Sequence, residues 1–425
     1  MSKDKNRLSR RDFVKTAAGA TVAAATFNIL HEAHAGNADL IKVGLIGCGN
    51  RGTGAAQDCL KSASNVKLIA MADLFKDRLD TARETIKKNK QVAEGLAVDD
   101  DHCFVGLDAY KQLLKTDCAI VLICSPIFFH PIHLDAAIEA SKHCFMEKAA
   151  CVDAPGVRQI IATGEKAREK KLNIAVGTQR RHQANYLETI KRIQDGAIGE
   201  IVAGDAWWCG GGGARVYRPK PAEMSDVEFQ LRSWYRWRWT CGDHIVEQHV
   251  HNLDVITWVL GKYPTEARGM GSQLRRPIGD CYDNFAVDYV FPGDVHVLSM
   301  CRQINDCWNL VGEFVVGTKG KSNCANKITS GGKDWVSEAE GDKAYVQEHT
   351  DLIAAVRGEA PYLNEAENIA KSTLMAIMGR TSAYTGKKVT WEQALAMQEK
   401  YGPKELAFTD NPIGKPPIPP GPLSQ

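Results

Sequence analysis

The feature that most constrains this chain is a glycine-rich turn that follows a short apolar run. Residues 41–46 suit a buried strand, and Gly47, Gly49 and Gly52 then fall at the spacing G-x-G-x-x-G. The first glycine of such a turn permits a tight bend, the second lets the backbone approach a pyrophosphate, and the third lets a helix pack against the strand. The pattern therefore predicts a dinucleotide-binding turn and a helix over residues 53–62 whose N-terminal amides face the phosphates.

An acidic residue after the next apolar run supports this interpretation. Residues 66–72 form that run, and Asp73 ends it 21 positions beyond Gly52, where an acid that binds ribose hydroxyls is expected. Taken alone, Asp73 is equally well explained as a turn residue or a helix N-cap. Together with the glycines, it indicates a cofactor site and favours NAD over NADP.

The composition limits the class of partner. The chain has 425 residues, 44% of them apolar, and a formal charge of only +2, whereas nucleic-acid and membrane-surface binders carry a large basic excess. The length is enough for two domains. We therefore expect a small-molecule ligand, with no nucleic-acid partner and no membrane span in the mature chain.

The N-terminus resembles an export signal. Residues 9–15, which include Arg10 and Arg11, are similar to a twin-arginine motif, an Ala-rich segment follows, and residues 33–35 (Ala-His-Ala) are a cleavage candidate. We expect residues 1–35 to be a signal peptide and the protein to be periplasmic or otherwise exported. One alternative is an amphipathic or disordered tail with a chance arginine pair. A transmembrane anchor is disfavoured because the segment is short and contains Thr and Asn.

Strand and helix patterns alternate through residues 36–180. Apolar runs at 119–124, 144–146 and 173–177 follow the first two, which predicts an α/β fold with a doubly wound parallel sheet, the Rossmann arrangement. Ligands of such a sheet bind at the carboxyl ends of its strands. The cofactor-binding candidates at that edge are Gly47, Gly49, Asn50, Arg51, Gly52, Asp73, Ser125, Pro126, His130, Glu147 and Lys148.

The second half of the chain has a different pattern. Alternating segments such as 284–291 and 295–302 indicate an antiparallel sheet with one covered face. We expect residues 181–390 to form an α+β domain with an open antiparallel sheet. Residues 391–425 are expected to be a C-terminal segment with a Pro-rich tail.

One stretch of the second domain carries several groups that can move protons. Residues 242–258 predict a single helix, which would align four side chains along one stripe: Glu247, His251, Asp254 and Trp258. Glu247 and His251 are then a candidate proton-handling pair that faces the cofactor. Two alternatives remain open: a metal site, disfavoured because H-E-x-x-H is missing, and a structural set of histidines at a domain junction.

Lys148 is a second catalytic candidate because it follows a predicted strand. Loss of hydride from an alcohol requires a base for the hydroxyl proton. Lys148 could act as that base if burial lowers its pKa, or it could stay charged and stabilise a developing alkoxide. The alternative is a surface salt bridge with Glu147.

These motifs together resemble the Gfo/Idh/MocA family, named for glucose-fructose oxidoreductase and inositol dehydrogenase, over most of residues 40–390. The resemblance rests on residues 47–52, 147–148, 180–181 and 196–199, and on the pattern His251-x-x-Asp254-x-x-x-Trp258. It implies that Lys148 and His251 are catalytic. An aspartate usually stands where this chain has Glu247. Ala149 replaces the proline that normally favours a kink after the lysine, and a cis bond without proline costs about 3 kcal/mol.

The resemblance implies an NAD-dependent oxidoreductase that acts on a hydroxyl of a sugar, polyol or glycoside. His251 would take the hydroxyl proton, Lys148 would steady the oxygen, and Glu247 would orient His251 or the sugar. Because free NAD is scarce outside the cytoplasm, an exported enzyme is expected to retain and recycle it. Two alternatives remain: a glycosidase that oxidises a sugar carbon transiently and then returns the hydride, and a non-catalytic sugar-sensing protein.

Further side chains are weaker candidates for substrate contacts. They are Arg180, Arg181, Trp237 and Asp254, with Trp234 and Trp239 as aromatics that would stack on a sugar unless they belong to the core. No metal site is expected. The family also implies a homo-oligomer formed through the open sheet.

Overall fold

A computed structural model of the chain describes residues 39–211, 219–274, 279–339, 341, 343–403 and 405–411. The chain divides into a unit of residues 1–40 and a unit of residues 41–425. The predicted export signal and the Pro-rich tail lie outside the described residues. In the part that is described, no helix is long and apolar enough to cross a membrane.

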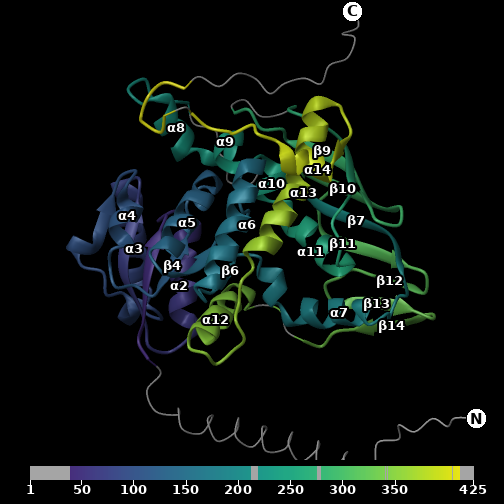
Figure 1. The fold of residues 1–425 in the computed structure, drawn as a ribbon, viewed down its shortest axis with the longest axis horizontal. Coiled ribbons are helices and arrows are strands. Elements are labelled where there is room, and N and C mark those ends of the chain that lie inside the picture. Colours follow the sequence, from purple (N-terminus) through teal and green to yellow (C-terminus); the bar gives the residue numbers. More distant parts are fainter. Residues whose placement is uncertain are drawn as a thin grey trace, which may run out of the picture. The chain divides into compact units, whose positions relative to one another are not determined.

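The first sheet is the predicted parallel Rossmann sheet (Figure 1). Its six strands lie in the order β3-β2-β1-β4-β5-β6, and every pair is parallel. Their bounds are β1 Ile41–Ile46, β2 Val66–Asp73, β3 Cys103–Val105, β4 Ile120–Ile123, β5 His143–Met146 and β6 Ile174–Val176. The order reverses between β1 and β4, and a ligand crevice is expected at such a point.

Helices cover both faces of this sheet, and its central strands are mostly apolar and buried. All four residues of β4 are buried, as expected for a central parallel strand. The helices are α2 Asn50–Ser62, α3 Lys76–Lys88, α4 Ala109–Leu113, α5 His130–Glu139 and α6 Ala154–Glu169. Helix α2 begins at Asn50, inside the glycine motif and three residues earlier than predicted.

The second sheet has nine strands in the order β14-β13-β12-β11-β7-β10-β9-β8-β15. Their bounds are β7 Ile201–Gly210, β8 Glu266–Ser272, β9 Asn284–Phe291, β10 Val295–Gln303, β11 Leu310–Gly317, β12 Gly320–Ser322, β13 Lys327–Ser330, β14 Lys333–Val336 and β15 Val389–Thr390. The sheet is mixed, because β10 and β7 pair in parallel while the other pairs are antiparallel. Strands β7 and β10 are far apart in the chain, so no hairpin forces them to run in opposite directions.

Helices of the second half cover one face of this sheet and join it to the first. They are α7 Ala184–Gln194, α8 Asp226–Arg232, α11 Val250–Leu260, α12 Ala344–Val356, α13 Ala366–Thr385 and α14 Trp391–Ala396. Helix α13 packs on both β8 and α6, and α12 packs on α2. A single buried apolar cluster therefore runs from the Rossmann sheet into the second sheet.

The prediction of one helix over residues 242–258 was wrong. The structure has two helices in this range, α10 His244–Glu247 and α11, and a short helix, α9 Arg238–Cys241, ends just before it. Gly242 and Asp243 have φ of +77° and +85°, which a continuous helix does not allow. A second break falls at Gln248 and His249, where the backbone carbonyl of Glu247 accepts a hydrogen bond from Lys148. In a continuous helix the Glu247 carbonyl would accept a hydrogen bond from the backbone amide of His251. Here it accepts one from Lys148 of the Rossmann domain instead.

Candidate functional site

The glycine turn has the shape that a dinucleotide needs. Gly47 has φ of +92°, and a Cβ on it would lie 2.6 Å from the backbone of Cys124. A Cβ on Gly52 would lie 1.8 Å from the carbonyl oxygen of Gly47. The N-cap of α2, Gly49, offers no side-chain hydrogen bond, and the first turn of α2 has no acidic residue. The residues therefore fit a pyrophosphate bound by the backbone amides at this helix end.

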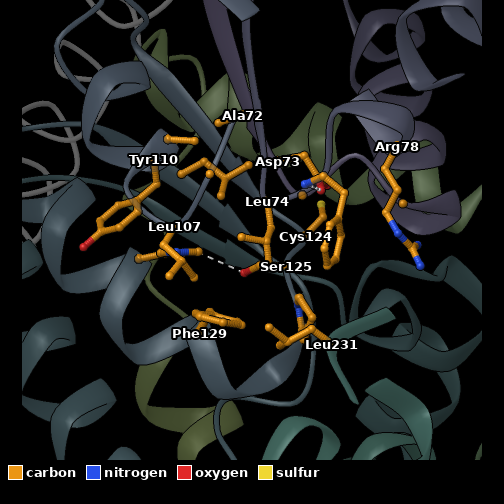
Figure 2. A pocket seen from close by; sticks show the side chains of 18 of the residues that line it. Ala72, Asp73, Leu74, Arg78, Leu107, Tyr110, Cys124, Ser125, Phe129 and Leu231 are labelled. Atoms are coloured by element: carbon orange, nitrogen blue, oxygen red, sulfur yellow. Dashed lines mark hydrogen bonds between the residues drawn. The ribbon is translucent and has the colours of Figure 1, made fainter. Parts of the chain in front are cut away.

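Asp73 lies in a pocket that opens beside this turn (Figure 2). The carboxylate of Asp73 accepts hydrogen bonds from the backbone amides of Cys48 at 2.6 Å and of Phe75 at 2.8 Å. Burial raises the pKa of Asp73, and the two amides work against that rise. The amides fix the carboxylate at the end of β2, the position predicted for an acid that binds ribose.

The other walls of the pocket come from two further strand ends and from the second half of the chain. The walls include Ile46, Gly47, Gly49, Leu74, Leu107, Tyr110, Ser125, Pro126, Leu231 and Trp234. Asn50 lines a neighbouring hollow that shares Gly49 and Arg78 with this pocket. The predicted cofactor contacts Ser125 and Pro126 thus face the pocket.

His130 does not face it. The ring of His130 is fully buried, with Nδ1 2.7 Å from the carbonyl oxygen of Ala149 and Nε2 2.9 Å from that of Ser125. The prediction of a cofactor contact is therefore corrected: His130 braces the loop after β4 against the loop after β5. Neither ring nitrogen is left to bind a ligand.

The side chain of Arg51 is also directed elsewhere. Its guanidinium pairs with Glu147 at 2.5 Å and with Glu348 of α12 at 3.1 Å. Burial opposes the charge, but the two carboxylates outweigh it and raise the pKa of Arg51. Arg51 and Glu147, both predicted cofactor contacts, thus form an ion pair with each other. This pair holds the end of β5 directly before Lys148.

Lys148 reaches into the second half of the chain. Its Nζ donates to the backbone carbonyl of Glu247, to Oε1 of Glu247 at 3.1 Å and to Oε1 of Gln248 at 3.3 Å. The alternative of a surface salt bridge with Glu147 is wrong, because the Lys148 side chain is only 11% exposed and Glu147 pairs with Arg51. The Lys148–Ala149 peptide bond is cis, so the kink is present without proline.

His251 lies beside this lysine on the first turn of α11. Its ring stacks on the indole of Trp208, with centroids 5.6 Å apart. Burial lowers the pKa of His251 well below its usual value, and the positive charges of Lys148 and Arg180 lower it further. The imidazole is therefore neutral at pH 7, and a neutral ring has a lone pair that can accept a proton.

The remaining substrate candidates are committed to internal contacts. Arg181 forms a two-bonded ion pair with Asp254, at 2.7 and 3.0 Å, so these two predicted substrate contacts bind each other. Arg180 is buried and pairs with Glu313. Trp237 is buried in an apolar cluster, and its Nε1 donates to Ser233 at 3.1 Å. These contacts show how the four side chains are held inside the protein, and their substrate roles stay predictions.

Trp208 and Gln248 were missed in the sequence analysis. Trp208 follows Trp207 on β7, and only the register of the strand decides which of the two rings faces α11. Gln248 meets Lys148 because the helix breaks there. In the described part of the chain, no group of three or more His, Cys, Asp or Glu side chains is arranged to hold a metal ion.

The sequence matches two family profiles in succession. Residues 41–178 match an oxidoreductase family with an NAD-binding Rossmann fold, and residues 186–322 match the GFO/IDH/MocA C-terminal domain. One curated relative is an alpha-N-acetylgalactosaminidase of Shewanella oneidensis, 27% identical over 253 residues. That match covers 54% of this chain and 50% of the relative, so the chain spans about half the length of the curated relatives it matches.

Solved structures share the fold at low identity. Scyllo-inositol dehydrogenase of Lactobacillus casei with bound cofactor NAD(H) and scyllo-inositol has a TM-score of 0.63 at 18% identity, and the match covers 83% of this chain and 100% of that one. Aldose-aldose oxidoreductase of Caulobacter crescentus complexed with glycerol has a TM-score of 0.64 at 17% identity, with the same coverage. The Rossmann profile matches the part of the chain that forms the parallel sheet, and the C-terminal profile follows it directly in the sequence. The chain therefore belongs to the Gfo/Idh/MocA oxidoreductase family, with an NAD-binding Rossmann domain at residues 41–178.

Proposed function

We propose that this protein oxidises a hydroxyl group of a sugar, polyol or glycoside with an NAD that it retains and recycles. The observation that carries the proposal is the meeting of Lys148, from the carboxyl edge of the Rossmann sheet, with Glu247 and His251 from the second half of the chain. The solved relatives with bound scyllo-inositol or glycerol support a polyhydroxyl substrate.

The residues divide the proton chemistry between them. Neutral His251 accepts the substrate hydroxyl proton, and the stack on Trp208 holds its ring in place. The Lys148 ammonium stabilises negative charge on the substrate oxygen as the proton leaves. Glu247 holds that ammonium at 3.1 Å, so its first role is to position Lys148. Bound NAD would supply the hydride acceptor.

A second function, glycoside cleavage, is favoured by the curated relative named as an alpha-N-acetylgalactosaminidase. In that reaction a sugar carbon would be oxidised transiently, the aglycone would leave by elimination with loss of a proton from the sugar, water would add across the resulting double bond, and the hydride would return to the same sugar carbon. The same base and the same ammonium would serve the oxidation step. The overall reaction would leave the NAD unchanged.

A panel of polyols, aldoses and nitrophenyl glycosides separates the two functions. Net oxidation produces a ketone or lactone in step with the reduction of NAD or of a second sugar. Glycoside cleavage releases free nitrophenol without net oxidation. A protein that binds these sugars but turns over none of them would instead be the non-catalytic sensor.

We also propose that the protein is exported and forms an oligomer through its open sheet. Support for export comes from the twin-arginine-like sequence at Arg10 and Arg11.

Support for the oligomer comes from a row of apolar side chains across β7, β10, β9 and β8: Trp207, Met300, Ala286 and Met270. Met270 is 72% exposed, and exposed apolar rows of this kind mark interaction surfaces.

A further inference from the structure

One wall of the cofactor pocket does not come from the Rossmann domain. Leu231 and Trp234 line the pocket together with Asp73, and Figure 2 shows Leu231 across the pocket from Leu107 and Asp73. Leu231 is on α8 and Trp234 is on the 3₁₀ turn η6 Trp234–Arg236. We call residues 226–236, which comprise both elements, the strap.

The strap is bound to the edge of the Rossmann sheet beside Asp73. Arg78 of α3 donates to the backbone carbonyl of Arg232 at 3.0 Å, and Arg232 pairs with Asp77 at 3.2 Å. The guanidinium of Arg232 also lies 3.8 Å from the centre of the Phe75 ring. These three contacts hold the strap to residues 75–78, next to Asp73, the predicted ribose-binding carboxylate.

The C-terminal segment crosses the outside of the strap, as the yellow ribbon near α8 shows (Figure 1). The amide of Val227 donates to the carbonyl of Thr409 at 3.2 Å, and Gln230 donates to that of Asn411 at 2.8 Å. The ring of Phe408 stacks on Phe75, with centroids 6.1 Å apart. The segment at residues 405–411 therefore ties the strap to the Rossmann edge a second time.

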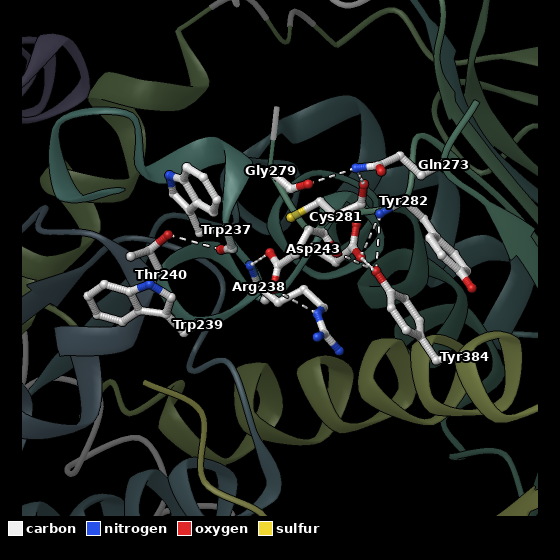
Figure 3. A network of polar contacts seen from close by, with 12 residues as sticks. Trp237, Arg238, Trp239, Thr240, Asp243, Gln273, Gly279, Cys281, Tyr282 and Tyr384 are labelled. Atoms are coloured by element: carbon white, nitrogen blue, oxygen red, sulfur yellow. Dashed lines mark hydrogen bonds and ion pairs between the residues drawn. The ribbon is translucent and has the colours of Figure 1, made fainter. Parts of the chain in front are cut away.

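The chain just after the strap is anchored by a buried polar network (Figure 3). Arg238 pairs with Asp280 at 3.1 Å, and Tyr384 of α13 donates to Asp243 at 2.6 Å. The backbone amide of Tyr282 also donates to Asp243 at 3.1 Å. The strap is thus anchored at this end, and its remaining contacts with the Rossmann edge are those with α3, the C-terminal segment and the apolar cluster that contains Phe75 and Phe129.

We propose that the strap covers the adenosine half of NAD and that Leu231 and Trp234 are cofactor-retaining residues. Asp73 marks the ribose position, so the apolar space between Leu107 and Leu231 is the place for the adenine ring. NAD can leave by that side only when the strap separates from Phe75 and Asp77. This inference rests on the proposed retention of NAD and assigns it to named side chains.

The test measures the dissociation rate of NAD from the full-length holoprotein. The protein is mixed with excess labelled NAD, and exchange of the bound nucleotide is followed by rapid gel filtration and chromatography. Leu231→Ala and Trp234→Ala each remove apolar contact with the adenine, and Phe408→Ala removes one tie of the strap. Each is expected to raise the dissociation rate at least about tenfold. Leu187→Ala removes an exposed leucine of α7 that does not line the pocket, and this control variant should exchange NAD like the unchanged protein.

The outcomes separate this inference from the proposed function. If the unchanged protein holds NAD and all three variants hold it equally well, the strap is not the retaining element, although the retained-cofactor function stands. If the unchanged protein itself releases NAD within the mixing time, the recycling proposal fails. In that case the equilibrium Kd for NAD tests the strap. A tenfold higher Kd in Leu231→Ala supports a contact between the strap and NAD, and an unchanged Kd overturns this inference.

Discussion

At the scale of single residues, the proposed reaction assigns the chemistry to Lys148 and His251. We predict that Lys148→Ala and His251→Ala each fold and hold NAD but lose turnover by about 10²-fold or more, the usual scale for a general acid or base. The reason is that, in the proposed reaction, Lys148 supplies the positive charge near the substrate oxygen and His251 supplies the neutral base. Steady-state rates on the best substrate of the panel measure this effect.

Glu247→Gln provides the graded comparison for that experiment. The amide oxygen of glutamine still accepts a hydrogen bond from Lys148, and the backbone carbonyl of residue 247 is unaffected. Its loss of turnover should therefore be smaller than that of either alanine variant. Nearly full activity in His251→Ala would show that the proton goes to another group.

Asp73 should decide between the two nicotinamide dinucleotides. Its carboxylate is held in place by two backbone amides, where it can accept from ribose hydroxyls and repel a 2′-phosphate. We predict tighter binding of NAD than of NADP, and a smaller difference in Asp73→Asn, as measured by calorimetry on cofactor-free protein. Equal or tighter binding of NADP by the unchanged protein would remove Asp73 from this role.

At the scale of elements, the turn after β6 is joined to α12 by a histidine with an unusual charge state. The Nδ1 of His182 lies 2.6 Å from Asp351 of α12, and the Nε2 lies 3.5 Å from Glu365. Burial alone would lower the pKa of His182, but the two carboxylates outweigh it and raise the pKa to about 10. The folded protein therefore binds this proton more tightly than the unfolded chain, where the pKa is about 6.5.

The sign of the linkage follows from that difference. Stability from His182 is fully present below about pH 6.5 and is lost as the pH rises toward 10. We predict that His182→Gln lowers the Tm by about 3 °C or more at pH 6, and by less than half as much near pH 10. Thermal scans of both proteins at each pH give the differences.

His102→Gln is the control for this experiment. His102 also pairs with a carboxylate, Asp99 at 2.6 Å, but both side chains are exposed and such surface pairs contribute little. Its Tm should match that of the unchanged protein at both values of pH. A His182→Gln difference that is equal at pH 6 and pH 10 would mean that packing, and not charge, is lost.

At the scale of the whole molecule, the proposed export requires the proposed retention of NAD, because free NAD is scarce outside the cytoplasm. If Arg10 and Arg11 direct export of an already folded chain, NAD is bound in the cytoplasm and carried out. We predict that mature protein purified from the export compartment releases close to one nucleotide per chain on heat denaturation and works without added NAD. Replacing both arginines by lysine should keep the protein in the cytoplasm. Empty protein that needs stoichiometric NAD would favour a cytoplasmic dehydrogenase.

The outer face of the second sheet gives a prediction about assembly. Met270 and Met300 belong to one apolar row, and a charge placed there would be buried without a partner in a face-to-face contact. The double variant Met270→Asp, Met300→Asp should therefore be monomeric in light scattering, while the unchanged protein is a larger species. A monomeric unchanged protein would contradict the proposed oligomer.

The sequence by itself determined those features that depend on neighbouring residues. The glycine turn, the parallel strands and the end of β2 at Asp73 were predictable because strand and turn preferences act over a few residues. The family motifs also pointed to Lys148 and His251. Local patterns hold this information because strand, turn and helix preferences show in the order of neighbouring residues, even where the strands pair over longer distances.

Only the tertiary structure decided which of the polar side chains meet. Lys148 and Glu247 are 99 residues apart in the chain, and their contact goes with a break in the helix that the local pattern predicted. Arg181 and Asp254 were candidates for a ligand but bind each other across 73 residues. The strap reaches the cofactor pocket through contacts with α3 and the C-terminal segment. Contacts over such separations leave no periodic signal in the sequence, because they depend on how whole domains pack.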